Sequence, residues 1–442
     1  MSDAGAVARN PASGAHFECK VDLSNPTPES LDAIKSDLIR KIAENVSHEL
    51  QQGERDVAIM EHDRHYSNSP VSDLRNTFAW RSNVVLARAQ SEFVGHQASA
   101  FLAHLDRLRA LDNERASQLE LLMSQAHPRS VLRVLTAPEV TRRLRVRTSN
   151  SILDCAHFLA TALAAEAAVR GTSSIETPMW TAVGDKFVSP LGEISVPLCV
   201  DGYQAIDVAS PQARSMDPSS AICKKRICRA PISGSVRTRV EDLLIEGSEG
   251  IQAVSTFAWA LVSGCVTNLV IVEEPEVYFS SCTNGFYIGR VAIASKDWFV
   301  TKVADLVGSL VHEAIHCLLL MLNFCTPLIV DDEAVNRLDP VTSPWTNNPL
   351  PISTYVHACM VWYGLASFWQ LAQEVAAFDA GTIERMYDQA RRGFLRGDIL
   401  SQLSPEAIEL VSYSARRQIQ GMQESILAAQ VADGAKYFGS AI

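Results

Sequence analysis

The chain has 442 residues, of which 47% are hydrophobic and 20% are charged, and its formal net charge is −11. This length allows about two or three domains, and this composition is typical of a soluble globular protein. A nucleic-acid-binding surface needs a basic stripe, so the negative charge argues against a nucleic-acid partner. The first residues show no basic segment followed by an apolar one, and we therefore expect no secretion signal and a cytoplasmic location.

The first third of the chain is expected to be helical. Residues 1–28 are polar and irregular, and the region 29–170 follows as a helical layer. Apolar residues recur at helical spacing over three stretches of this region: about 29–53, 72–126 and 150–170. Between the last two, we interpret the arginine-rich run from Arg142 to Arg147 as a helix end whose arginines are solvated or paired with carboxylates, rather than as an anion site.

The region 171–300 is expected to be a mixed α/β region with short strands. Prolines and glycines interrupt short apolar runs up to about residue 235, and helices are expected at about 235–247 and 250–264. The uncharged run 251–272 is long enough to cross a bilayer but carries several polar residues. We therefore expect a buried helix that leads into a strand, and no membrane partner.

Two strands are then predicted, Leu269–Val272 and Phe286–Ile293, with turn-forming residues at 283–285 between them. The final region, 301–442, is expected to be helical and to bind a metal. It can form one continuous domain with 171–300.

The sequence HEAIH at residues 312–316 is the strongest functional signal. In a helix, residues four apart lie on one face with Cβ atoms about 5–6 Å apart, so both imidazoles can ligate one ion while Glu313 reaches its open side. Ser295 or Asp297 is expected to cap this helix, and Cys317 is expected to turn away from the histidines. The alternative is a pair of hydrogen-bonded core histidines, but burial of a carboxylate without a cation is costly.

Four segments around this motif follow one another in an order that is found in a known protein family. They are the strand-like run Gly289 to Ile293, the helix Leu310 to His316, the loop at Pro344-Trp345, and a following helix with His357 near its start and Phe368-Trp369 near its end. Over about residues 280–370 the chain thereby resembles the HExxH-type 2-oxoglutarate- and Fe(II)-dependent peptide β-hydroxylases associated with modified-peptide biosynthesis in bacteria.

The resemblance implies a mononuclear non-haem iron oxygenase that uses 2-oxoglutarate and molecular oxygen to hydroxylate a peptide or an amino-acid-derived small molecule. It also implies that His357 is the third metal ligand, beside His312 and His316. His357 lies near the start of an apolar helix shortly after a loop, which agrees with this role, although a core histidine is the alternative. The expected fold class is α+β and predominantly helical, with a small sheet packed beside the HExxH metal helix and a second ligand-bearing helix.

The chain departs from this family in the loop around Trp345. Members commonly carry arginines where this chain has Thr346 and Leu350, and an arginine fork is the natural clamp for the distal carboxylate of 2-oxoglutarate. Arg290 and Arg337 are the candidate replacements, with a structurally paired Arg290 as the alternative. Three aromatic residues can shape a pocket or simply fill the core: Trp345, Tyr355 and Trp362.

A zinc hydrolase is the second interpretation of the same motif. Zinc lowers the pKa of a bound water to about 7, and Glu313 would be the general base that activates this water. The strand 286–293 would hold an extended peptide by edge pairing. Leu319 stands where the metzincin continuation needs glycine, and Glu374 is the best-placed alternative third ligand. A purely structural zinc is disfavoured, because such sites usually have four ligands with cysteine among them.

Overall fold

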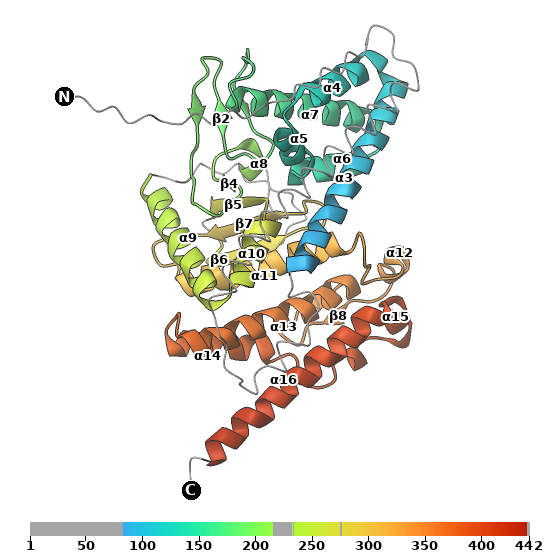
Figure 1. The fold of residues 1–442 in the computed structure, drawn as a ribbon. Helices are drawn as coiled ribbons and strands as arrows, with labels where there is room; N and C mark the ends of the chain where they lie inside the picture. The colour runs from blue at the N-terminus through green and yellow to red at the C-terminus, as the bar shows by residue number, and fades with distance from the viewer. Residues whose placement is uncertain (1–82, 215–231, 233, 275, 440–442) are drawn as a thin grey trace, which may run out of the picture.

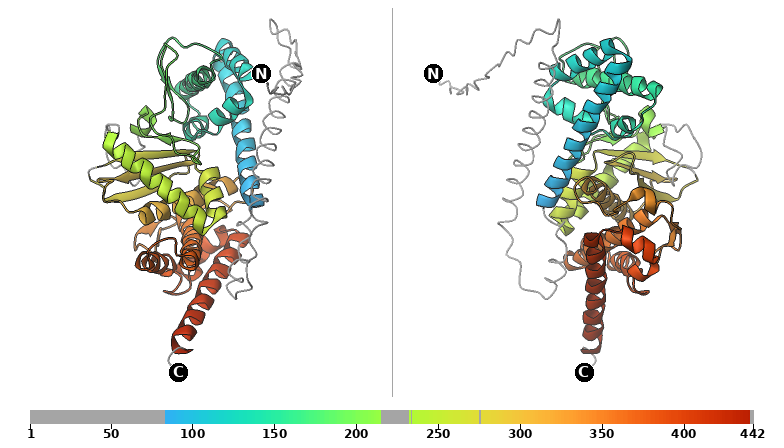
Figure 2. Two further views of the ribbon diagram at one scale, coloured as in Figure 1. Left: turned by 60° about the vertical axis from the view of Figure 1, so that its left-hand side comes forward. Right: turned by 90° about the vertical axis from the view of Figure 1, so that its right-hand side faces the viewer.

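The computed structural model describes residues 83–214, 232, 234–274 and 276–439, so the helix predicted at 29–53 lies outside the described residues. The described chain is mostly helical and contains three small sheets, which confirms an α+β protein in which helices predominate (Figure 1). Helices of the first described third form one end of the molecule, the largest sheet lies in the middle, and the C-terminal helices form the other end (Figure 2).

The N-terminal end of the described chain has a hydrophobic core of its own. Its helices are α3 (Asn83–Leu111), α4 (Asn113–Gln125), α5 (Pro128–Leu135), α6 (Pro138–Arg145) and α7 (Ser149–Val169). The stretch predicted as one helical pattern over 72–126 is divided at Asp112, whose side chain accepts a hydrogen bond from the N–H of Arg115 and so caps α4.

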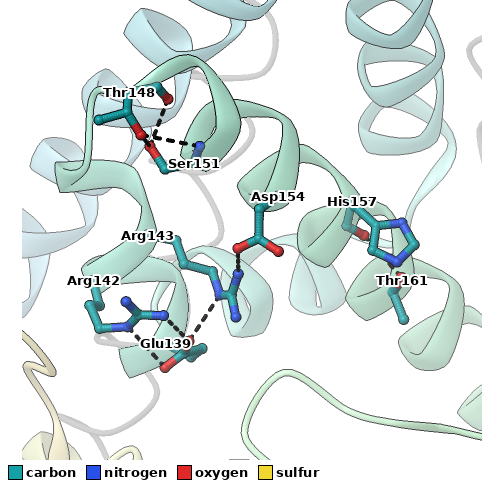
Figure 3. Close-up of polar contacts among 8 residues, drawn as sticks. All are labelled: Glu139, Arg142, Arg143, Thr148, Ser151, Asp154, His157 and Thr161. Atoms are coloured by element: carbon teal, nitrogen blue, oxygen red, sulfur yellow. Dashed lines mark hydrogen bonds and ion pairs between the residues drawn. The ribbon is translucent and has the colours of Figure 1, made fainter. Parts of the chain in front are cut away.

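The arginine-rich end of α6 is held by carboxylates. Arg142 and Arg143 both donate to Glu139, at 2.6 and 2.9 Å, and Arg143 also pairs with Asp154 on α7 (Figure 3). These contacts confirm the interpretation of the two arginines as salt-bridge partners. Arg145, in the last turn of the same helix, instead donates to a backbone carbonyl far away in sequence.

Short strands and three helices connect this end to the central sheet. They are β1 (Met179–Trp180), β2 (Phe187–Val188) and β3 (Ile194–Ser195), which form an antiparallel sheet, and then α8 (Pro211–Arg214), α9 (Gly234–Val254) and α10 (Thr256–Cys265). The short strands predicted after residue 171 are therefore present. The sequence predicted one helix ending at about residue 247 and the next beginning at about 250. This boundary is wrong, because α9 continues to Val254 and Ser255 caps α10 by accepting a hydrogen bond from the N–H of Ala258.

The central sheet positions the histidine motif. Its strands, in spatial order, are β4 (Ile206–Asp207), β5 (Asn268–Glu273), β7 (Arg290–Ser295) and β6 (Phe279–Thr283). The first three run parallel, and β6 lies antiparallel at the edge. The register aligns Leu269 with Val291 and Val270 with Ala292, so the larger side chains face the main core and the smaller ones face away. β5 confirms the strand predicted at Leu269–Val272.

The second strand prediction needs correction. The strand predicted at 286–293 begins only at Arg290, because residues 284–289 form a turn in which Tyr287 donates its N–H to the carbonyl of Asn284. The edge strand β6 was not predicted at all. Its sequence, FSSCT, is too polar to show the alternation of apolar side chains that marks a half-buried strand.

The histidine motif lies on α11 (Val303–Leu322). The elements after it are α12 (Asp332–Val335), β8 (Val341–Thr342), β9 (Pro349–Leu350), α13 (Ile352–Val375), α14 (Ala380–Arg391), the 3-10 helix η2 (Leu400–Gln402), α15 (Pro405–Leu410) and α16 (Tyr413–Gly439). Neither residue predicted to cap α11 does so. Ser295 ends β7 and lies 3.0 Å from the hydroxyl of Thr301, Asp297 accepts from the N–H of Phe299, and α11 begins after Lys302.

Two of the described helices, α7 and α11, are long and apolar enough to cross a membrane by length and composition alone. Both contribute many buried side chains to hydrophobic cores, α7 at the helical end and α11 in the main core. Their apolar character is therefore compatible with core helices of a soluble protein. The uncharged run 251–272 likewise divides between the end of α9, α10 and the start of β5.

Candidate metal centre

One face of α11 carries the two histidines of the motif. His312 and His316 are half-buried and lie one turn apart, with ring centroids 5.0 Å from each other. Other faces of this helix pack against α9, α10 and the sheet, where Leu310, Val311 and Ile315 are at most 2% exposed. The two imidazoles thus share the side of the helix that remains partly open.

A second helix brings a third imidazole to this face. His357, on α13, is 8% exposed, and its ring stacks on that of His316 with centroids 5.8 Å apart. Further along α13, the half-buried Trp362 presents its ring edge-on to His312 at 5.6 Å. His357 lies beside His316, and the later residue Trp362 lies beside the earlier residue His312, so α13 and α11 are antiparallel. The three histidines form one cluster.

All three imidazoles are neutral at physiological pH. Burial lowers the pKa of His312 and of His357 to about 4, and burial together with the two neighbouring rings holds the pKa of His316 well below its usual range. Within the part of the chain that the structure describes, none of the three rings has a hydrogen-bond partner. Neutral imidazoles with unused nitrogens are the form in which histidine binds metals.

The donor set suits a metal ion, although the rings do not form a finished coordination shell. Imidazole nitrogens bind first-row ions at about 2.0–2.1 Å, so rings with centroids about 5–6 Å apart are close enough to share an ion between them. Among the described residues, no group of three His, Cys, Asp or Glu side chains converges as a complete metal site. Binding an ion would therefore require the rings to turn toward one another about their side-chain torsions.

Glu313 points away from the histidine stripe toward the edge of the sheet. Its side chain is 4% exposed, and the carboxylate accepts hydrogen bonds from the hydroxyl of Ser281, at 2.7 Å, and from the backbone N–H of Thr283. Burial raises the pKa of Glu313 to about 7, and the two hydrogen bonds from β6 oppose this rise. The carboxyl group is therefore fixed at two points and is poised to exchange a proton near neutral pH.

Cys317 lies on the same side of α11 as Glu313. It is fully buried, and its sulfur lies 3.5 Å from the hydroxyl of Thr283. Burial raises the pKa of its thiol to about 12, which keeps it protonated. The prediction that Cys317 turns away from the histidines is confirmed.

The three aromatic residues named as pocket candidates have different surroundings. Trp362 alone contacts a histidine of the cluster. Trp345 stacks on Trp362 with centroids 6.0 Å apart, and its indole N–H donates to the carbonyl of Ala390 at 2.8 Å. Tyr355 is fully buried and donates to the carbonyl of Ile399, so it is a core residue. Only Trp362 therefore lines the cluster, and Trp345 supports it from behind.

The two arginines predicted to hold a cosubstrate lie elsewhere. Arg290 extends from the sheet face opposite α11, where it donates to the carbonyl of Gln212 at 2.6 Å and lies over the ring of Tyr287. Arg337 is on the surface, 70% exposed, in a loose pair with Glu333. Arg290 is therefore a structurally paired residue, which was the alternative to cosubstrate binding. Neither arginine lies beside the histidines.

Glu374 is also remote from the cluster. It follows His357 by 17 positions on the same helix, which corresponds to roughly 25 Å at about 1.5 Å per residue. Because His357 lies beside His316, a glutamate at that distance cannot reach an ion held by His312 and His316. The third-ligand alternative of the zinc interpretation is therefore wrong, and His357 remains as the partner of the motif.

Sequence reasoning missed the groups that hold Glu313. Ser281 and Thr283 lie on β6, a strand that no sequence pattern predicted. Their contact with α11 depends on strand pairing rather than on local sequence. No protein-family model matches the chain, and no curated protein sequence matches it either.

Proposed function

We propose that the chain is a mononuclear non-haem iron oxygenase whose ion would be held by His312, His316 and His357. The observation that carries this proposal is the cluster of three neutral imidazoles, contributed by two antiparallel helices, whose nitrogens have no other described partner. None of these ring nitrogens is among the buried unpaired atoms of the described residues, so the nitrogens remain accessible to an incoming ion. A divalent metal ion is the ligand that imidazole prefers.

Three protein ligands would leave open positions on the ion, which favours a reactive centre over a structural one. With 2-oxoglutarate and molecular oxygen, bound Fe(II) supplies an oxidant for an unactivated C–H bond. The substrate proposed from the family resemblance is a peptide or an amino-acid-derived intermediate of natural product biosynthesis. Trp362 would exclude water on one side of the centre. Glu313, whose carboxyl group is held by β6, would support the centre indirectly by fixing α11 against the sheet.

A zinc-dependent hydrolase is the second candidate, and Glu313 is the observation that favours it. Its carboxyl group has a pKa raised to about 7, as suits a general base, and it is bound to the edge strand β6. An extended peptide would add to β6, the longer of the two described strands at the edges of this sheet. This corrects the sequence prediction that residues 286–293 provide the edge, because β7 has a neighbouring strand on each side.

Anaerobic reconstitution distinguishes the two candidates. Purified protein is loaded with Fe(II) or with zinc, and each form is given oxygen and 2-oxoglutarate or a mixture of peptides. The oxygenase proposal predicts oxygen uptake and succinate release with Fe(II) only, at a slow uncoupled rate without the true substrate. Zinc-dependent peptide cleavage without oxygen uptake would instead establish the hydrolase.

A further inference from the structure

The loop that carries Trp345 is held from outside by the segment that follows α14. Arg392 donates to the carbonyl of Trp345, and Arg396 donates to that of Pro344, each at 2.8 Å. Within the loop, the hydroxyl of Ser343 accepts a hydrogen bond from the N–H of Trp345 at 3.3 Å. The backbone at Trp345 is therefore fixed by hydrogen bonds from within the loop and from a neighbouring segment.

The indole of Trp345 lies so close to Gly393 that a side chain at Gly393 would collide with the ring. A Cβ atom there would lie 2.6 Å from the indole nitrogen, although the backbone of Gly393 is not left-handed. The close approach of the ring, and not the backbone conformation, thus requires glycine. The indole N–H also donates to the carbonyl of Ala390, and the ring of Phe394 meets the indole at 5.1 Å. Residues 390–394 therefore determine where the ring lies.

Two aromatic contacts connect Trp345 to the histidine cluster. The rings of Trp345 and Trp362 lie within 9° of parallel, with centroids 6.0 Å apart, and Trp362 meets His312 edge-on at 5.6 Å. An ion can be shared only if the imidazoles turn toward one another about their side-chain torsions. In a close-packed interior, a neighbouring indole restricts such a rotation. The position of Trp362 therefore limits the orientations that are open to His312.

We propose that Trp345 is a positioning residue of the metal centre. Held against Gly393, Trp345 fixes Trp362, and Trp362 keeps the ring of His312 turned toward the other two histidines. The effect is specific to His312, because no ring contact joins Trp362 to either of the others in the described part of the chain. This inference rests on the proposed function, and Trp345 itself would touch neither the ion nor the substrate.

The test adds one methyl group on the far side of Trp345 from the histidines. Metal-free protein is titrated with Co(II), which binds imidazole as Fe(II) and zinc do and whose visible absorption bands report its ligand geometry. We expect Gly393→Ala to weaken Co(II) binding about tenfold and to shift the bands, because the orientation of a ligand is disturbed. Gly381→Ala, on α14, is the matched control. Its Cβ atom would meet only Asp379, at 3.6 Å, so it should change neither.

A double-mutant cycle shows whether Gly393 acts through Trp345. Trp345→Leu should itself weaken Co(II) binding, and Gly393→Ala should have little further effect in that background, since the ring that the methyl group meets is gone. An equal loss of affinity with and without the indole would overturn the proposal. So would a Gly393→Ala protein that is less stable in urea but keeps the Co(II) affinity and bands, because Trp345 would then only fill the core. Trp362→Phe, a smaller change, should also weaken binding and serves if Gly393→Ala does not fold.

A measurement on metal-free protein separates this proposal from the proposed function. Diethyl pyrocarbonate modifies neutral imidazoles, and peptide mass spectrometry locates the modified residues. We expect His312 to react several-fold faster in Gly393→Ala than in the unaltered protein, while His316 and His357 react as before. If the unaltered protein binds no Co(II), the proposed function is wrong, but the faster reaction would still establish that Trp345 positions His312. An unchanged rate at His312 would refute the positioning role in either case.

Discussion

Buried carboxylates are paired with arginines in the helical N-terminal end of the molecule, whereas three histidines of the main core lack described partners. In the helical end, Arg133 donates to Glu166 at 2.8 Å and also to Asp185, so that burial of these charges is offset by pairing. In the main core, α11 and α13 instead bring together three imidazoles without hydrogen-bond partners among the described residues. Removal of one partner from the paired charges would leave a buried charge uncompensated, whereas the accessible imidazoles of the cluster have no described protein partner and are free to bind an ion.

A lone unpaired histidine in the helical end shows which feature matters. His104, on α3, is fully buried, both of its ring nitrogens lack partners, and burial and Arg107 lower its pKa to about 4. It is therefore as neutral as the three histidines of the main core. It stands alone, however, and one imidazole cannot form a metal site. Clustering, and not neutrality, separates the two regions.

The largest expected effect is the loss of metal. His316→Ala removes the central ring of the cluster, and we expect Fe(II) or zinc bound per chain to fall from about one to near zero, since two remaining ligands hold an ion poorly. Elemental analysis after gel filtration measures this. His104→Ala is the matched control and should bind as much metal as the unaltered protein. Equal binding by His316→Ala would remove this cluster as the metal centre.

The next effect concerns the paired charges of the helical end. Arg133→Ala leaves Glu166 and Asp185 buried without their cation, and we expect a loss of about 3 kcal/mol in the free energy of unfolding. Urea denaturation followed by circular dichroism gives this value. Arg337→Ala breaks a pair whose arginine is 70% exposed, and should change stability by less than about 0.5 kcal/mol. Equal effects of the two substitutions would contradict the contrast between the regions.

A smaller, pH-dependent effect is expected at β4. Asp207 is fully buried, and burial raises its pKa from 3.8 to about 6 despite hydrogen bonds from Ser210 and Ala209. The unfolded chain therefore ionises first, so the contribution of Asp207 to stability falls as pH rises from about 4 through 6, by about 3 kcal/mol. Asp207→Asn should remove this part of the pH dependence in urea titrations at a series of pH values.

Asp379 provides the control of opposite sign. Its exposed carboxylate caps α14 by accepting from Thr382, and these hydrogen bonds lower its pKa. Its stabilising contribution is therefore lost as pH falls through the lowered pKa, and Asp379→Asn should matter most above that pH. If both substitutions changed stability in the same pH range and direction, the assignment of Asp207 would be wrong.

Local patterns in the sequence were enough to predict the longer helices and the face shared by His312 and His316, because helical periodicity is a property of neighbouring residues. The division at Asp112 and the end of α9 at Val254 were not predicted. The strand β6 and the hydrogen bond from Ser281 to Glu313 were not predictable, because strand pairing and side-chain contacts join residues that are distant in sequence. The surroundings of Arg290 were not predictable for the same reason, because the Gln212 carbonyl that it binds is 78 positions away in sequence.

The smallest effect tests the lone histidine. His104→Leu removes two unsatisfied nitrogens from a core and replaces the ring with an apolar side chain, so we expect stability to stay the same or to rise by up to about 1 kcal/mol. His104→Ala should instead lower it by roughly 2 kcal/mol, because it leaves a cavity. Both values come from urea midpoints in one buffer. A loss above about 1 kcal/mol in His104→Leu would show that this lone imidazole stabilises the helical end, and His104 would then no longer serve as a neutral comparison for the clustered histidines.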